Sequence, residues 1–217
     1  MYRISNKEIT LFFHVAKIGN WKPVKNEILD TIYTSGLNDQ LSNLIINETD
    51  GKDFEYPTIE KIKAFSQQNP NQLVVYIHTK GVSKGVCELS KKWREWIVEF
   101  TIKRWRESVS IFNTVNDVDC TGTRLIILGN VSFYTGNFWW AKTDYINKLG
   151  NISDAPKFRG YRYNCESWLL SNPNFKAISL NNDFSDFINL KYKDIPFLKS
   201  NIKIVEKDND KINVTYL

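Results

Sequence analysis

Nearly continuous apolar runs alternate along the chain with segments of helical periodicity. The apolar runs are rich in Ile, Leu, Val and Phe, and they lie at 9–16, 44–46, 73–77 and 125–128. The helical segments repeat apolar residues at about 3.6-residue spacing, and they lie at 24–33, 58–69 and 89–112. Apolar runs without alternation are typical of strands buried on both faces of a parallel sheet. The pattern therefore predicts strand–helix repeats.

Shorter signals complete the expected order of elements. They are an aromatic cluster at 133–140, a short helix at 144–149, and two alternating strands at 202–205 and 212–216 around a turn at 208–210. Strands that alternate with helices predict a three-layer α/β fold, in which helices flank a mostly parallel central sheet. We see no linker or internal repeat, so residues 1–217 are expected to form one domain, which could belong to a longer protein.

Composition narrows the class of protein. The 217 residues include 29 basic and 24 acidic side chains, a formal net charge of +5, but the charges are interleaved. We therefore expect no nucleic-acid partner. No apolar stretch reaches the ~18 residues of a membrane span, and no apolar leader is found near residue 1. Three cysteines without C-x-x-C spacing fit a reducing compartment, so we expect a cytoplasmic protein.

Three predicted strand ends carry polar residues. These ends are residues 14–16 (HVA), 47–51 (NETDG) and 78–81 (HTKG). In open α/β sheets, ligands bind beyond the carboxyl ends of the strands. The chain contains no G-x-G-x-x-G, P-loop or G-x-S-x-G motif, so the sequence favours a ligand site of another kind.

Four strings carry a resemblance to a known family. They are residues 76–83 (YIHTKGVS), 93–94 (WR), 134–141 (YTGNFWWA) and 166–169 (ESWL). Together they resemble the GT-A-like nucleotide-sugar glycosyltransferases of large DNA viruses and bacteria, most of all rhamnosyltransferase domains that build viral capsid glycans. The likeness covers about residues 9–170, and residues 171–217 match no part of it.

The resemblance implies a glycosyltransferase that moves a hexose or deoxyhexose, such as L-rhamnose, from a UDP-sugar to a glycan or glycoprotein acceptor. Residues 1–115 would form the donor-nucleotide half, and residues 116–217 the acceptor half with the C-terminal strands. A viral member would act in the host cytoplasm. The donor-binding residues it implies are His14, Val15, Ala16, Trp21, Asp50, His78, Thr79, Lys80, Arg94, Arg159 and Arg162. Trp21 would cover the base, and Asp50 would bind a polar group of uracil or ribose.

A departure from the family concerns the metal. GT-A-like enzymes usually carry Asp-x-Asp after the third or fourth strand, where His78-Thr79-Lys80 stands in this chain. A lysine ammonium can neutralise the departing diphosphate as a cation does. We therefore predict that Lys80 aids UDP departure without a required cofactor, with Mn²⁺ or Mg²⁺ as the alternative. The D-x-D at 117–119 is expected on the wrong side of the sheet, in a loop or helix cap.

The resemblance also implies the remaining site residues. Glu166 would be the general base of an inverting transfer, with Asp144 as the second candidate. The acceptor sugar would meet Gly136, Asn137, Trp139 and Trp140, and only one of the two tryptophans can face the pocket. Arg94 could instead pair with Glu95 or Glu99. The alternative function is a catalytically inactive carbohydrate-binding module of the same fold.

Overall fold

The computed structural model describes residues 8–84, 87–156, 160, 163–182, 202–209 and 211–216. Its main sheet has eight strands in the order β10-β9-β8-β4-β7-β3-β1-β2. These are β1 (Ile9–Ala16), β2 (Leu41–Thr49), β3 (Leu73–His78), β4 (Cys120–Thr123), β7 (Trp139–Lys142), β8 (Asn174–Leu180), β9 (Lys203–Asp208) and β10 (Lys211–Tyr216). A separate two-stranded sheet pairs β5 (Leu125–Leu128) with β6 (Val131–Tyr134).

The sheet is mixed. β1 runs parallel to both β2 and β3, and β4 runs parallel to β8. β7 lies between β3 and β4 and is antiparallel to both, and β9 is antiparallel to its neighbours β8 and β10. The predicted α/β class is therefore confirmed. Six of the eight strands run in the same direction, but β7 and β9 run against them, so four of the seven strand pairings are antiparallel and the sheet is not the mostly parallel one that the sequence predicts. The two predicted halves of the chain contribute strands to one sheet.

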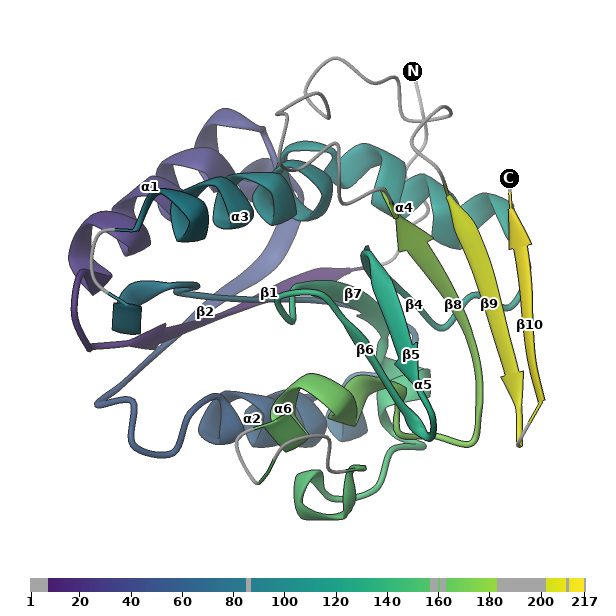
Figure 1. The fold of residues 1–217 in the computed structure, drawn as a ribbon. Coiled ribbons are helices and arrows are strands. Elements are labelled where there is room, and N and C mark those ends of the chain that lie inside the picture. Colours follow the sequence, from purple (N-terminus) through teal and green to yellow (C-terminus); the bar gives the residue numbers. More distant parts are fainter. Residues whose placement is uncertain are drawn as a thin grey trace.

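Helices cover both faces of the sheet and make three layers (Figure 1). On one side lie α1 (Trp21–Thr34), α3 (Glu88–Val98) and α4 (Trp105–Thr114), and on the other lie α2 (Tyr56–Gln68), α5 (Thr143–Ile146) and α6 (Asn164–Ser167). Successive strand residues point to opposite faces, so Phe13 belongs to the first core and Phe12 to the second. Short 3₁₀ helices are η1 (Asn38–Gln40), η2 (Val82–Lys84), η4 (Ile152–Asp154) and η6 (Trp168–Leu170).

The long helix predicted at 89–112 is interrupted. A π-helical segment, η3 (Glu99–Lys103), separates α3 from α4. The carbonyl of Thr101 within it accepts a hydrogen bond from Trp140 Nε1, at 2.9 Å. Periodicity near 3.6 residues cannot reveal such a turn, because the buried side chains on either side keep almost the same spacing.

The run at 125–128 is not the buried central strand that the sequence predicts. It forms β5, whose residues are only half-buried and whose Leu128 is exposed. The sheet centre is instead built by β4 and β7, and β8 was also unpredicted. In the part of the chain that the structure describes, no helix has the length and apolarity to cross a bilayer.

Candidate functional site

A cavity opens where the chain connections change direction in the sheet. From β1 the chain passes to β2 on one side and then to β3 on the other. His14 and His78 are partners in the β1–β3 register, close to the carboxyl ends of both strands. Beyond them lies a cavity of about 580 Å³. Ligands of open α/β sheets generally bind at such a switch point. The cavity lies at the strand ends where the sequence predicts a ligand site.

The 78–81 turn places Lys80 at this cavity. The Thr79 amide donates a hydrogen bond to the carbonyl of His14 at 3.0 Å, and its hydroxyl accepts one from the Ala16 amide at 3.1 Å. Lys80 Nζ lies 4.8 Å from the ring centroid of Trp93, a cation–π distance, and both residues line the cavity. The turn therefore joins β1 and β3 and holds an ammonium at the cavity wall.

Arg94 lies behind this turn, outside the cavity. Its side chain is nearly fully buried, and its Nη2 is 2.8 Å from Glu27 Oε2. Its Nη1 donates a hydrogen bond to the Lys80 carbonyl at 3.2 Å. The predicted contact with the donor phosphates is thus not supported, and Glu27, not Glu95 or Glu99, is the ion-pair partner.

His78 lies between two hydrogen-bond acceptors. Its Nε2 is 2.9 Å from the carbonyl oxygen of Gly136, and its Nδ1 is 3.4 Å from Glu55 Oε1. Carbonyl and carboxylate oxygens only accept, so the doubly protonated ring satisfies both contacts. Glu55 precedes α2 and lines the cavity, and sequence reasoning missed it.

Glu166 lines the same cavity from α6, as the base assignment requires. Arg124 and Tyr163 also line it, and neither was predicted. Arg124 occupies the tight turn after β4, with φ of 47°, and its carbonyl accepts hydrogen bonds from both the amide and the hydroxyl of Thr135. Arg159 and Arg162 lie outside the described residues.

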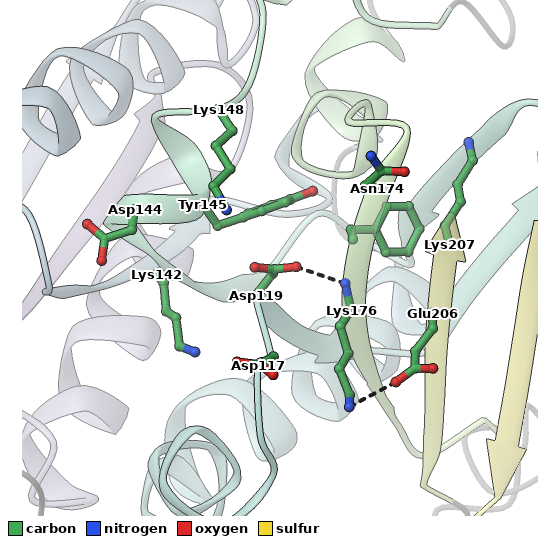
Figure 2. A pocket seen from close by; sticks show the side chains of 11 residues that line it. Asp117, Asp119, Lys142, Asp144, Tyr145, Lys148, Asn174, Lys176, Glu206 and Lys207 are labelled. Carbon is green, nitrogen blue, oxygen red and sulfur yellow. Dashed lines mark hydrogen bonds and ion pairs between the residues drawn. The ribbon is translucent and has the colours of Figure 1, made fainter. Parts of the chain in front are cut away.

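Asp144 is not brought near Glu166. It lies at the opposite end of the strands, in a second cavity with the D-x-D carboxylates and several lysines (Figure 2). Its Oδ1 accepts a hydrogen bond from the Asn71 amide at 3.1 Å. The prediction that Asp144 is the second candidate base at the donor site is therefore wrong, because Asp144 lines the other cavity.

The D-x-D motif has a structural role at that opposite end of the strands, as expected. Asp119 precedes β4, and its Oδ2 accepts a hydrogen bond from the Lys176 amide at 2.8 Å, so it links the start of β4 to β8 (Figure 2). Burial raises the pKa of Asp119. Among the described residues, no three His, Cys, Asp or Glu side chains gather in a way that could hold a metal ion.

Of the remaining donor predictions, His14 and Ala16 line the cavity, and three other residues do not. Val15 points to the opposite face of β1 and belongs to the core under α1. Trp21 packs against that same core. Asp50 is exposed and pairs with Lys52 at 3.1 Å. These three positions are corrections to the predicted donor site.

The predicted contact of the acceptor sugar with Trp139 or Trp140 is also corrected. Trp139 and Trp140 are both only 1% exposed, and they belong to cores on opposite faces of β7. Trp139 Nε1 donates to Asn137 Oδ1 at 3.0 Å, and Asn137 Nδ2 donates to the carbonyl of Cys165 at 3.3 Å. Of the predicted acceptor residues, only Gly136 lines the cavity.

Residues 3–159 match a family described as a domain of unknown function (DUF8361), and the chain belongs to that family. The matched range includes the cavity-lining residues of β1, β3 and α3. No curated protein and no solved structure matches the chain.

Proposed function

We propose that the protein is a GT-A-like glycosyltransferase, which moves a hexose or deoxyhexose from a UDP-sugar to a glycan acceptor. The observation that carries the proposal is that Lys80 and Glu166 line one cavity at the switch point of an α/β sheet. A cation and a carboxylate on the walls of one cavity are the two groups that such a transfer needs.

Lys80 would stabilise the departing UDP. When the bond between the anomeric carbon and the β-phosphate oxygen breaks, the electron pair stays on the phosphate, and negative charge grows there. A fixed ammonium stabilises that charge, because it needs little reorganisation during the reaction. Trp93 restrains the Lys80 side chain, and Arg124 is a second basic residue that lines the cavity.

Glu166 would act as the base. Its carboxylate would take the proton of the acceptor hydroxyl while that oxygen attacks the anomeric carbon, which gives inversion. The aromatic and aliphatic side chains that line the cavity suit the apolar faces of a sugar ring. They include Phe54, Ile126, Phe133 and Trp93.

Calorimetry with UDP and a transfer assay with a panel of UDP-sugars test the donor assignment. Lys80→Met is expected to lower turnover at least 100-fold, since one electrostatic donor contributes about that much. Lys148→Met removes the same charge at the second cavity, at the opposite end of the strands, and should leave turnover near wild type. Failure of UDP to bind at millimolar concentration would remove the proposal.

The base and the metal are tested separately. Glu166→Gln should abolish transfer and retain UDP affinity, whereas Glu60→Gln, on the exposed side of α2, should change neither. Turnover should persist in EDTA; loss that Mn²⁺ or Mg²⁺ restores would replace the Lys80 mechanism with a metal site. UDP binding without turnover of any donor would favour the inactive carbohydrate-binding module.

A further inference from the structure

A chain of hydrogen bonds runs from the surface of α2 to the base of the cavity. It begins at Lys61, whose Nζ lies 2.6 Å from Asn47 Oδ1. An ammonium only donates, so this contact fixes the carboxamide of Asn47 with its oxygen toward Lys61. The amide nitrogen must then face the other way, where it lies 2.8 Å from Thr58 Oγ1.

The hydrogen bond to Asn47 determines which atom donates between Thr58 and His14. Thr58 is fully buried, and its Oγ1 lies 2.7 Å from His14 Nδ1. Its oxygen accepts from Asn47, and the described part of the chain offers the hydroxyl proton no acceptor except His14 Nδ1. A buried hydroxyl left without an acceptor is costly, so the hydroxyl donates and Nδ1 accepts. The ring proton of His14 is therefore on Nε2.

The Nε2–H group of His14 is available to a ligand. His14 is only 2% exposed, yet it lines the cavity, and its Nε2 has no hydrogen-bond partner among the described residues. Burial, with the nearby charge of His78 adding to it and Glu55 opposing it, lowers the pKa of His14 to about 4. At neutral pH the cavity thus contains one buried, neutral donor whose tautomer is fixed.

We propose that His14 is a specificity-determining residue, which donates its Nε2–H to a carbonyl oxygen of the uracil base of the donor. The proposal deepens the proposed function and rests on it. A neutral donor suits a neutral oxygen, whereas the charged phosphates suit Lys80 in the turn after the neighbouring strand β3. A base with an amino group at the same place would meet N–H against N–H, and the unpaired donors would weaken its binding.

The tautomer can be measured without any ligand. The chain has only two histidines, so long-range ¹H–¹⁵N spectra of ¹⁵N-histidine protein, with His78→Gln for assignment, report His14 directly. We expect the neutral Nε2–H form at pH 7. Thr58→Val should mix the tautomers, whereas Thr114→Val, at an exposed site of α4, should not. An Nδ1–H form, or a charged ring at pH 7, would overturn the proposal.

Ligand analogues test the recognised atom. UDP, CDP, 2-thio-UDP and 4-thio-UDP are compared by calorimetry, because sulfur is a poor acceptor and cytosine replaces one carbonyl with an amino group. Wild type should bind one thio analogue about tenfold more weakly than UDP, and His14→Phe and Thr58→Val should reduce that ratio. Equal affinities in wild type would overturn the role of His14 alone, and no UDP binding would overturn the proposed function with it.

Discussion

Arg94 donates a hydrogen bond to the backbone carbonyl of Lys80, while its guanidinium also pairs with Glu27 of α1. One buried side chain thereby ties α1, α3 and the turn after β3 together. The turn itself has Gly81 at φ +84°, and a Cβ there would lie 3.0 Å from Ser90 Cβ of α3. The position of Lys80 thus depends on a residue that never reaches the cavity.

Replacing Arg94 should destabilise the protein. Arg94→Met removes both contacts and leaves Glu27 unpaired, so we expect the free energy of unfolding to fall by about 2 kcal/mol, less than for a fully buried pair because Glu27 is partly exposed. Lys91→Met removes an exposed charge of the same helix and should cost less than about 0.5 kcal/mol. Urea unfolding measures both, and equal losses would contradict the role given to Arg94.

Gly136 should tolerate no side chain. Its φ is +82°, and a Cβ would collide with Ile97 Cδ1. Gly136→Ala should therefore cost more than Gly129→Ala, where φ is +60° but nothing lies within 4 Å, and where only backbone strain of about 1 kcal/mol is added. Thermal unfolding compares the two variants. The double variant Gly136→Ala/Ile97→Ala should cost less than the sum of its single changes, and strict additivity would refute the collision.

Trp140 should matter for stability and not for ligand contact. Trp140→Phe removes the hydrogen bond to Thr101 and leaves a void, so we expect a loss of about 2 kcal/mol. Trp21→Phe, at a partly buried position, should cost less. Denaturant unfolding and UDP calorimetry are run on the same samples. If Trp140→Phe has normal stability and weakened UDP binding, the result would contradict a purely structural role and support the predicted ligand contact of Trp140.

The low pKa of His14 makes stability depend on pH. An exposed histidine titrates near 6.5, and burial lowers the pKa of His14 to about 4. Between these values the unfolded chain binds a proton that the folded chain does not, so the free energy of unfolding falls as the pH falls from 6.5 to 4. The full shift corresponds to about 3 kcal/mol.

His14→Gln isolates this contribution. All other titratable groups are common to the two proteins, so the stability of wild type minus that of the variant should decrease by about 3 kcal/mol between pH 7 and pH 4. Urea unfolding at four or five pH values measures the difference. Parallel pH profiles for the two proteins would show that His14 titrates normally.

The strands that form the cavity could be read from the sequence, and most of its walls could not. β1 and β3 are buried on both faces, so almost every residue in them is apolar, and their ends indicate where a ligand would lie. β4 is as deeply buried, but its sequence, CTGT, has small polar residues whose burial is imposed by neighbouring strands. Arg124, which follows it, could not be recognised without that strand.

The two adjacent tryptophans show a second limit. Alternation along a strand correctly predicts that Trp139 and Trp140 face opposite ways. It cannot tell whether the strand is at an edge or in the centre of a sheet. β7 proves to be central, with helices over both faces, so both side chains are buried. Trp93, on α3, is the tryptophan at the cavity.

The position of β7 has a consequence for biosynthesis. β3 pairs on its far side with a strand that the ribosome adds only after α3 and α4, at residues 139–142. Until then one edge of β3 would have unpaired backbone N–H and C=O groups beside apolar side chains, and such an edge can pair with other chains. A product terminated near residue 115 should therefore precipitate, and chaperones should bind the growing polypeptide most strongly before Trp139 has emerged.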